Sequence, residues 1–544
     1  MREYIADKSV DLVYLDPPFN SARDYNILFS APGGGKSEAQ ITAFEDSWHW
    51  GQQAEKEFGE ILNSGRTHVA EMIQALRNFL GESTIMAYLV MMANRLIELR
   101  RVLKDTGSLY LHCDPTASHY LKIVLDSIYG AQNFRSEIIW KRTSSHSSAR
   151  RWGPIHDTIL FYANSPTFTW NKIYGTYDES YIKKYYRHID NDGRNFRLSD
   201  LTGSGTRNGE SGKEWGGFNP TSFDRHWAIP TEVKEQFRDV AEEQLTPHQW
   251  LDLFDKHGLV SLKAEGRDWP HVKRYLDRMQ GIAQQDIVLD IPPLSSRDAE
   301  RLGYPTQKPL ALLERIISAS SNKGDIVLDP FCGCGTAVHA AQNLGRKWIG
   351  IDITHLAVSL IEKRLKDAFP GVQFSTYGTP KDIEGARELS KRDKYQFQWW
   401  ACSLVDAQPY RDKKKGADGG IDGIIYFQDE HRGHKKIIVS VKGGEHVNVG
   451  MIRELAHVVH SEKAEIGLFV TLARPTSPMV VEAAGAGFYQ SPLTKKQYPR
   501  IQILTVKELL DGKKPQYVDF SEGRATYKRA KREDRKKVEL KLKV

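Results

Sequence analysis

The chain has 544 residues, of which 40% are hydrophobic and 27% are charged, and its formal net charge at pH 7 is +7. This length exceeds what one hydrophobic core supports and predicts about two to four domains. No stretch approaches the roughly 18 apolar residues of a membrane-spanning helix, and the N-terminus lacks a signal peptide's apolar core, so we expect a soluble, cytoplasmic protein.

The first predicted element is a strand that ends in an unusual turn. The run "VDLVYLD", residues 10–16, has the apolar character of a strand buried in a parallel sheet. Pro17 and Pro18 lack the N–H that a central strand needs. Asp16 and Phe19 are therefore expected on a stiff loop at the carboxyl end of the strand, where ligands bind in open α/β sheets. An ordinary strand followed by a proline turn is the alternative.

The next elements continue an alternation of strands and helices through residues 1–140. "IMAYLVMMANRLIELRRVLKDTG" has helical periodicity and predicts a helix that stops at Gly107. "SLYLHCD", residues 108–114, predicts another buried strand. Residues 141–300 differ, because they are rich in Ser, Arg and aromatic residues and weakly periodic. We expect an inserted recognition region there rather than a sheet domain.

A second informative stretch begins at Asp325 and reads "DIVLDPFCGCGTAVHAAQNLGRKWIGIDI". It predicts a strand, a tight glycine loop, a helix and a further strand. Gly333 and Gly335 would let the backbone approach a ligand, and Asp352 stands where an acid can accept ribose hydroxyls. The loop continues with Thr336 instead of a third glycine, which favours a nucleoside without a pyrophosphate over a dinucleotide. An ordinary strand–helix turn is the alternative.

Together these stretches resemble the β group of DNA amino-methyltransferases. In that group a catalytic D-P-P-[FY] motif precedes the cofactor loop F-x-G-x-G, and the target-recognition region lies between them. Here residues 16–19 come first, residues 141–300 follow, and Phe331-x-Gly333-x-Gly335 comes last. "YPTQKPLALLERII", Tyr304 to Ile317, matches the segment before the cofactor strand. The resemblance covers about residues 7–365.

The resemblance implies a Rossmann-like α/β domain that transfers a methyl group from S-adenosylmethionine to a base flipped out of double-stranded DNA. Asp16 and the carbonyl of Pro17 would accept the two N–H bonds of the exocyclic amine, Pro18 would stiffen the turn, and Phe19 would stack on the base. Adenine N6 is favoured over cytosine N4, because Asp heads the motif more often in adenine enzymes of the group. The cofactor-binding residues that it implies are Thr306, Lys308, Asp329, Phe331, Gly333, Gly335, Thr336 and Asp352.

Lys308 and the N-terminus each raise a question within this resemblance. Lys308 can neutralise the methionine carboxylate of the cofactor, and a solvated lysine is the alternative. The family usually has a further segment before "DKSVDL", ending in a Gly-Asp pair that helps to hold the cofactor, and this chain begins six residues earlier. We therefore expect either a displaced start or a lowered affinity for the cofactor.

The C-terminal stretches "KKKGADGGIDGIIYF" and "KKIIVSVKGGEHVNVGMIRELAHVV" predict strands and a helix. They resemble the PD-(D/E)-x-K nuclease fold, particularly the Mrr-like restriction group, which implies Asp422 as a Mg²⁺ ligand and Lys442 beside the attacking water. Ser440 stands where the motif has Glu, Asp or, in the Mrr-like group, often Gln. Gln398 stands where related proteins often carry an acid, and Glu454 could supply a displaced carboxylate. The domain would then cleave DNA or be retained as a DNA clamp.

The resulting division of the chain has five parts. They are the catalytic half (residues 1–140), the target-recognition insertion (141–300), the cofactor-binding half (301–380), the restriction-endonuclease-like domain (395–520) and a basic tail (521–544). We expect a restriction–modification or defence enzyme, with restriction-system subunits and a homodimer left open as partners. The alternative from another class is a DNA-binding protein without methylation activity.

Overall fold

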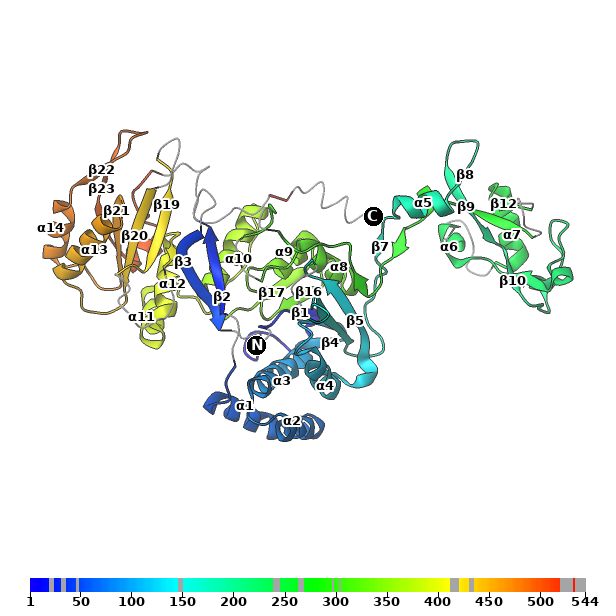
Figure 1. Cartoon of the computed structure of the whole chain (residues 1–544), viewed down its shortest axis with the longest axis horizontal. Coiled ribbons are helices and arrows are strands. Elements are labelled where there is room, and N and C mark those ends of the chain that lie inside the picture. Colours follow the sequence, from blue (N-terminus) through cyan, green and yellow to red (C-terminus); the bar gives the residue numbers. More distant parts are fainter. Residues whose placement is uncertain are drawn as a thin grey trace. The chain divides into compact units, whose positions relative to one another are not determined.

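The computed structural model divides into two compact units, Met1–Asn171 with Asp286–Val544, and Lys172–Gln285 (Figure 1). No helix in the described part of the chain is long and apolar enough to cross a membrane. Only the backbone is described for β2 (Asp24–Ser30) and β3 (Lys36–Glu45). The other described residues are 1–18, 48–144, 150–237, 245–262, 269–295, 298–302, 304, 306–410, 420–429, 435–518, 532 and 533.

A seven-stranded sheet forms the centre of the first unit, with the strand order β15-β5-β6-β4-β1-β16-β17. β6 is antiparallel to its neighbours and the other pairs are parallel, which confirms the predicted α/β fold for this part. The strands are β1 (Val10–Leu15), β4 (Leu103–Cys113), β5 (Phe134–Lys141), β6 (His156–Ala163), β15 (Ile287–Val288), β16 (Ile326–Asp329) and β17 (Lys347–Gly350). Accompanying helices are α1 (Gln52–Leu62), α2 (Thr67–Leu80), α3 (Thr84–Val102), α4 (Ser118–Tyr129), α8 (Leu310–Ser320), α9 (Thr336–Asn343) and α10 (His355–Ala368).

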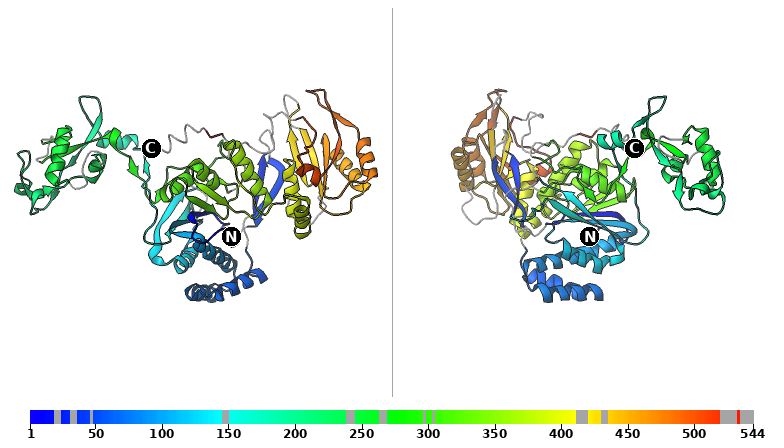
Figure 2. Two further views of the ribbon diagram at one scale, coloured as in Figure 1. Left: turned by 180° about the vertical axis from the view of Figure 1, so that it is seen from behind. Right: turned by 45° about the vertical axis from the view of Figure 1, so that its right-hand side comes forward.

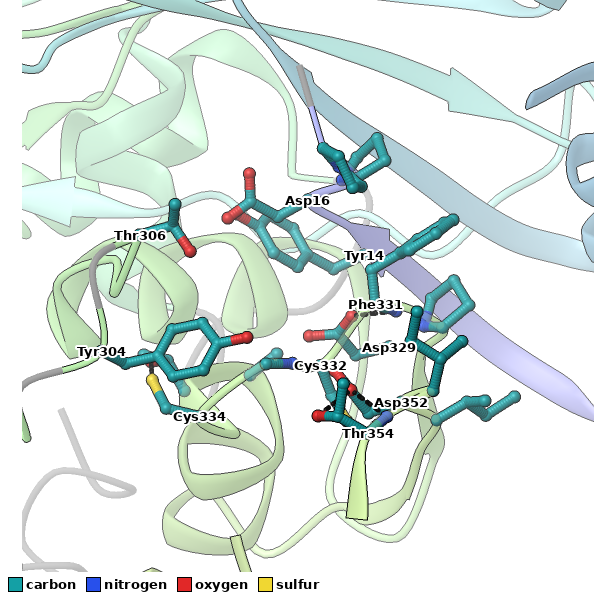
Figure 3. A pocket seen from close by; sticks show the side chains of 18 of the residues that line it. Tyr14, Asp16, Tyr304, Thr306, Asp329, Phe331, Cys332, Cys334, Asp352 and Thr354 are labelled. Carbon is teal, nitrogen blue, oxygen red and sulfur yellow. Dashed lines mark hydrogen bonds between the residues drawn. The ribbon is translucent and has the colours of Figure 1, made fainter. Parts of the chain in front are cut away.

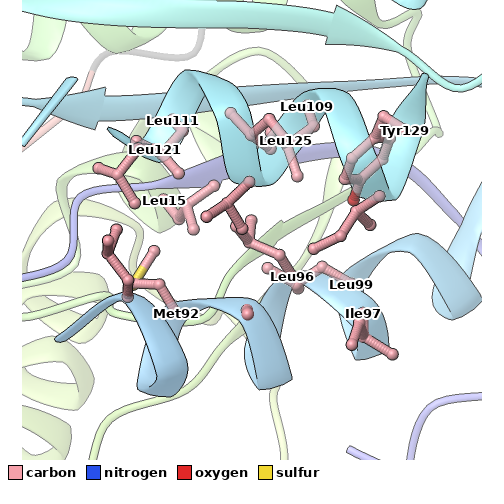
Figure 4. Packing of buried hydrophobic residues seen from close by; sticks show 14 of the residues in the cluster. Leu15, Met92, Leu96, Ile97, Leu99, Leu109, Leu111, Leu121, Leu125 and Tyr129 are labelled. Atoms are coloured by element: carbon pink, nitrogen blue, oxygen red, sulfur yellow. The ribbon is translucent and has the colours of Figure 1, made fainter. Parts of the chain in front are cut away.

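The sheet is covered on both faces, which explains the continuous apolar run of β1. Successive side chains of a strand point to opposite faces. Val13 and Leu15 join the apolar cluster formed with α3 and α4, part of which Figure 4 shows. Leu12 and Tyr14 join a second cluster with side chains of α8 and α9. A strand buried on both sides therefore carries no polar alternation.

The predicted end of the α3 helix at Gly107 is wrong. The helix ends at Val102, and Leu103 is already extended (φ −75°, ψ 131°) at the start of β4. Gly107 lies inside β4, where a Cβ atom would stand 2.6 Å from Leu103 Cδ1 and 3.0 Å from the carbonyl oxygen of Asp11. The glycine therefore allows a close approach to β1 and does not terminate the helix.

The second unit, Lys172–Gln285, has its own core and its own small sheets. A four-stranded sheet has the order β12-β13-β9-β8, and aromatic side chains such as Trp227, Trp250 and Phe254 fill the cluster beside it. The expectation that this region is not a sheet domain is therefore wrong. The sequence pattern did not reveal the sheet, because most strands of this region are too short to show periodicity. The elements are β7 (Tyr174–Gly175), α5 (Glu179–Tyr185), β8 (His188–Ile189), β9 (Asn195–Asp200), β10 (Thr202–Ser204), β11 (Arg225–Trp227), α6 (Thr231–Lys234), α7 (Pro247–Lys256), β12 (Val260–Ser261), β13 (His271–Tyr275) and β14 (Ile282–Ala283).

Residues 383–518, here called the C-terminal part, contain a second mixed sheet with the order β18-β19-β20-β21-β24. β20, β21 and β24 are parallel, and α13 connects β20 with β21. Helices lie against both faces of this sheet (yellow to orange in Figure 2). The elements are α11 (Ile383–Arg392), α12 (Lys394–Leu404), β18 (Gln408–Pro409), β19 (Gly423–Phe427), β20 (Lys435–Lys442), α13 (Val449–Ser461), β21 (Ile466–Thr471), α14 (Ser477–Gly485), β22 (Phe488–Gln490), β23 (Gln497–Pro499), β24 (Ile501–Thr505) and α15 (Val506–Leu510).

Candidate active site

The site lies where β1 and β16, far apart in the sequence, become neighbours in the sheet. Leu12 pairs with Val327 and the strands are parallel, so their carboxyl ends meet at one edge. Asp16 directly follows β1, and Asp329 is the last residue of β16. A cavity of about 520 Å³ opens at this edge (Figure 3). Such an edge is the usual ligand position of open α/β sheets.

The cavity brings together most of the residues that the sequence predicted for one site. Phe19 lies outside the described residues, and Gly335 is not among the residues that line the cavity. Two side chains of α12, Gln396 and Trp399, also line the cavity. The predicted residues that line it are Asp16, Pro17, Pro18, Thr306, Lys308, Asp329, Phe331, Gly333, Thr336 and Asp352.

Asp16 is paired with a lysine that comes from the other half of the sequence. The Lys308 ammonium donates to Asp16 Oδ2 at 2.6 Å, and the two side chains are 10% and 15% exposed. The prediction that Lys308 binds the cofactor's carboxylate did not anticipate this partner. Screening by water is weak at such low exposure, so the ion pair fixes the orientation of Asp16.

The glycine loop after β16 requires both of its glycines. Gly333 and Gly335 have φ angles of +48° and +76°, which residues with a side chain rarely adopt. A Cβ atom on Gly335 would stand 2.8 Å from Ile361 Cγ1, and one on Gly333 would stand 3.1 Å from Tyr304 Cε1. The loop therefore approaches its neighbours closely, and Thr336 begins α9 directly behind it.

Asp352 ties this loop to the start of α10. The backbone N–H of Gly333 donates to Asp352 Oδ2 at 3.0 Å, and the N–H and hydroxyl of Thr354 donate to Oδ1 at 2.9 and 3.0 Å. Burial raises the pKa of Asp352, although these hydrogen bonds oppose the shift. The carboxylate is therefore held in place at the wall of the cavity.

Asp329 is the most buried of the three carboxyl groups in the cavity, with 4% exposure. The N–H of Phe331 donates to Asp329 Oδ1 at 3.1 Å. Burial raises the pKa of Asp329 well above its usual value, and the nearby Asp16 and Asp352 add to the shift. Keeping the ionised form of Asp329 in this position therefore lowers the stability of the folded protein.

A buried chain of three side chains begins at Tyr14, two residues before Asp16, and sequence reasoning missed it. The Tyr14 hydroxyl is 2.9 Å from His112 Nδ1, and His112 Nε2 is 3.1 Å from Asp157 Oδ2. Burial opposes ionisation of Asp157, but the His112 hydrogen bond and nearby cations place its pKa below the usual value. An ionised Asp157 can only accept, so His112 Nε2 donates to it, and in the neutral imidazole Nδ1 would then accept from the Tyr14 hydroxyl.

Arg364 of α10 is another residue that sequence reasoning missed. It is 4% exposed, and its Nη1 donates to the carbonyl oxygen of Cys334 at 3.1 Å and to the Thr336 hydroxyl at 3.2 Å. Its Nε donates to His339 Nδ1 at 3.2 Å. Arg364 therefore supports the glycine loop through Cys334 and Thr336.

In the C-terminal part, Asp422 is engaged by its neighbours in the fold. Gln398 Nε2 donates to Asp422 Oδ1 at 2.9 Å, and the N–H of Val441 donates to Oδ2 at 2.6 Å. Ser440 is buried on β20, and Lys442 ends that strand. No three His, Cys, Asp or Glu side chains of the described residues form a metal-binding group. The predicted Mg²⁺ ligand thus has no support from the geometry.

Comparison with known families matches the part of the chain that forms the cavity at Asp16. A family model described as DNA methylase matches residues 10–363, which is more than half of the chain. The chain belongs to this DNA methylase family. The matched range spans both halves of the cavity, from β1 to α10, and includes the whole second unit.

Several curated relatives share this methylase region. The type II methyltransferase M.EcaI of Enterobacter cloacae is 34% identical over 279 residues, covering 51% of this chain and 57% of the relative. The Mod subunit of the type III restriction-modification enzyme StyLTI of Salmonella typhimurium is 27% identical over 356 residues, covering 62% of this chain and 47% of the relative. The chain thus spans about half the length of these relatives.

Solved structures of DNA methyltransferases are similar at a low level. M1.HpyAVI in complex with S-adenosylmethionine is 15% identical, with a TM-score of 0.27 over 66% of this chain and 90% of that chain. The cytosine-N4-specific PvuII methyltransferase is 12% identical, with a TM-score of 0.29 over 68% and 84%.

The C-terminal part matches a different model, described as NACHT-associated inactive Restriction Endonuclease 1, over residues 401–511. The resemblance to a restriction endonuclease is therefore supported in its general form. The narrower assignment to the Mrr-like group has no support from this match. The description of this model as inactive is consistent with the contacts of Asp422, whose two oxygens accept from Gln398 and Val441.

Proposed function

We propose that this methylase transfers a methyl group from S-adenosylmethionine to the exocyclic N6 of adenine in double-stranded DNA. The observation that carries the proposal is that Asp16 and Pro17 line one cavity together with Asp329, Gly333 of the glycine loop, and Asp352. The E. coli K12 relative YhdJ, named a DNA adenine methyltransferase, is 50% identical over 78 residues, which are 14% of this chain and 26% of the relative. Cytosine N4 is the alternative base.

The cavity fits the proposed cofactor by charge and by space. Asp16, Asp329 and Asp352 place three carboxyl groups around it, which suits a ligand that carries a sulfonium and an ammonium group. Gly333 and Gly335 keep the loop free of side chains where the backbone must come close. Asp352 would accept the ribose hydroxyls, Thr306 and Phe331 would line the same site, and Thr336 begins the helix behind them. When bound, S-adenosylmethionine supplies an electrophilic methyl group.

Asp16 and Pro17 would prepare the amine of the target base. An exocyclic amine is a poor nucleophile, because its lone pair is delocalised into the ring. Asp16 and the Pro17 carbonyl would accept its two N–H bonds and localise that lone pair toward the methyl group. Pro17 and Pro18 stiffen the turn, so the acceptors are already in position when the base arrives. Phe19 would stack on the base once it is flipped out of the duplex.

The DNA-facing edge of the first unit carries cations and an exposed aromatic ring. β5 runs parallel to β15 and antiparallel to β6, so its end lies at the same sheet edge as Asp16. The connection after β5 contains Arg142, Arg150 and Arg151, and Trp152 is 99% exposed. Such residues contact phosphates and stack on bases. The second unit would read the sequence.

The test is methyl transfer by the purified full chain. DNA from a strain without methylation is incubated with the protein and S-adenosylmethionine carrying a labelled methyl group. We expect label in the DNA and N6-methyladenine after digestion to nucleosides. N4-methylcytosine would select the alternative base, and absence of label would refute the proposal in favour of a DNA-binding protein without methylation activity.

We propose further that the C-terminal part engages DNA and does not cleave it. Gln398 supplies an amide where a metal site needs an oxygen acid, and it occupies Asp422 Oδ1 at 2.9 Å. Lys442 and the basic tail could then serve as phosphate contacts. Incubation of supercoiled plasmid with the protein and Mg²⁺ should produce no nicked DNA. Restriction-system subunits would be the partners of such a protein, as the Mod-subunit relative indicates.

A further inference from the structure

The ion pair between Lys308 and Asp16 joins the two halves of the site. It links positions 292 residues apart, and both side chains line the cavity. The backbone on both sides of Lys308 is fixed by its neighbours. Gln307 beside it accepts from the N–H of Leu302 at 2.8 Å and donates to the carbonyl oxygen of Glu300 at 2.7 Å. The residue after Lys308 is the N-cap of α8, a helix packed in the core.

The surroundings of Lys308 are acidic. Its ammonium helps to keep the pKa of Asp157 low, and it moderates the raised pKa of Asp329. In the described part of the chain, it donates to Oδ2 of the Asp16 carboxylate at 2.6 Å. A carboxylate has a second oxygen, so this contact leaves Oδ1 as a further acceptor.

We propose that Lys308 is a positioning residue, which holds Oδ2 of Asp16 so that Oδ1 is presented to the amine of the target base. The inference rests on the proposed methyl transfer and departs from the cofactor-carboxylate role that the sequence predicted for Lys308. An unpaired carboxylate at the end of a strand would sample several rotamers. The ion pair selects one orientation before the base enters, which lowers the cost of reaching the reactive geometry.

The experiment compares Lys308→Met with Lys308→Arg in the full chain. Met keeps the length of the side chain and removes the charge, whereas Arg keeps the charge. The matched control is Lys104→Met, because Lys104 pairs with Asp11 at 2.7 Å at the other end of β1. Calorimetry gives the Kd for S-adenosylmethionine, and methyl transfer with saturating cofactor and DNA gives kcat.

We expect Lys308→Met to lower kcat roughly 100-fold while the Kd for S-adenosylmethionine remains close to that of the wild type. Lys308→Arg should restore most of kcat, and Lys104→Met should change neither value. In an Asp16→Asn background, the Lys308→Met change should cost little further, because paired residues are not additive.

Four results would overturn the inference. If Lys308→Met raises the Kd roughly tenfold or more and keeps kcat, Lys308 binds the cofactor's carboxylate instead. If Lys308→Met costs the same in the wild-type and Asp16→Asn backgrounds, Lys308 does not act through Asp16. A wild-type protein that transfers no methyl group would refute the proposed function, and the inference with it. An active wild type with an unaffected Lys308→Met variant would refute the inference alone.

Discussion

The two mixed sheets of this chain each place an aspartate beside a strand, but the two aspartates have different surroundings. Asp16 follows β1, contacts the Lys308 ammonium and lines a cavity of about 520 Å³. Asp422 precedes β19 and accepts from the Gln398 amide and the Val441 N–H. The Lys308 ammonium contacts Oδ2 of Asp16 and leaves Oδ1 as a further acceptor, whereas an amide and a backbone N–H engage both oxygens of Asp422.

The two places differ in whether the carboxyl groups are satisfied by the protein's own hydrogen bonds. In the cavity, three carboxyl groups stay together although burial raises the pKa values of Asp329 and Asp352. That arrangement costs stability unless a cationic ligand offsets it. In the C-terminal part, the polar groups satisfy one another, so no ligand is needed. Substitutions on each side can test this contrast.

The largest effect is expected from Asp16→Ala. Loss of the acceptor should reduce methyl transfer at least about 100-fold, because the amine is no longer oriented. The Kd for S-adenosylmethionine should change little, since Asp352 and the glycine loop remain. Asp105→Ala is the control, because Asp105 is exposed and pairs only with the exposed Lys8 among the contacts described. Normal methyl transfer by Asp16→Ala would remove Asp16 from the catalytic turn.

Asp352→Ala should weaken cofactor binding and affect chemistry less. Hydrogen bonds to a charged group contribute about 1.5–3 kcal/mol, so the Kd should rise roughly 10- to 150-fold. Methyl transfer at saturating cofactor should stay within a small factor of the wild type. Calorimetry measures the Kd directly, and an unchanged Kd would exclude Asp352 from the cofactor site.

The sequence predicted the parts of the site that are local in the chain. Asp16 and Pro17 belong to one motif, and Gly333 and Gly335 to another, because turns and tight loops require particular residue types at fixed spacing. The sheet then brings both motifs to one edge, as the strand assignments implied. The strands β1, β4 and β16 were predicted for the same reason, since their apolar runs are short and continuous.

The remaining parts depend on contacts between distant residues, which a local pattern does not contain. The Lys308–Asp16 pair spans 292 positions. The Tyr14–His112–Asp157 chain connects three different strands, and each residue alone looks like part of a buried strand. The end of α3 was misplaced because the apolar periodicity continues into β4, where strand pairing overrides it.

In the C-terminal part, Gln398→Glu should lower stability. The substitution replaces a donor to Asp422 with a second carboxylate, so the loss should be about 1–3 kcal/mol. If this geometry can hold a metal once an acid is present, Mg²⁺ will raise the melting temperature of this variant and leave that of the wild type unchanged. Gln398→Leu is the control, because it removes the donor without adding a charge. A wild-type response to Mg²⁺ would contradict the contrast between the two sites.

The smallest effect is expected from Asp329→Asn, which should raise the stability of the folded protein, whereas Gln398→Glu should lower it. The folded protein raises the pKa of Asp329, so it holds this proton more tightly than the unfolded chain does. Stability is then lost as pH rises from the unfolded pKa of about 3.9 through the folded value. At pH 7 the neutral amide should therefore stabilise the cofactor-free protein by about 0.5–2 kcal/mol, seen as a higher melting temperature.

The gain from Asp329→Asn should shrink as pH falls toward about 4, where the wild-type carboxyl group becomes neutral as well. Asp157→Asn is the matched comparison, because the pKa of Asp157 is lowered and its stabilisation is present above the unfolded pKa. That variant should melt lower than the wild type at pH 7. If Asp329→Asn also melts lower at pH 7, the carboxyl groups of the cavity do not cost stability. The cavity would then be as well satisfied as the surroundings of Asp422, and the contrast between the two aspartates would need another cause.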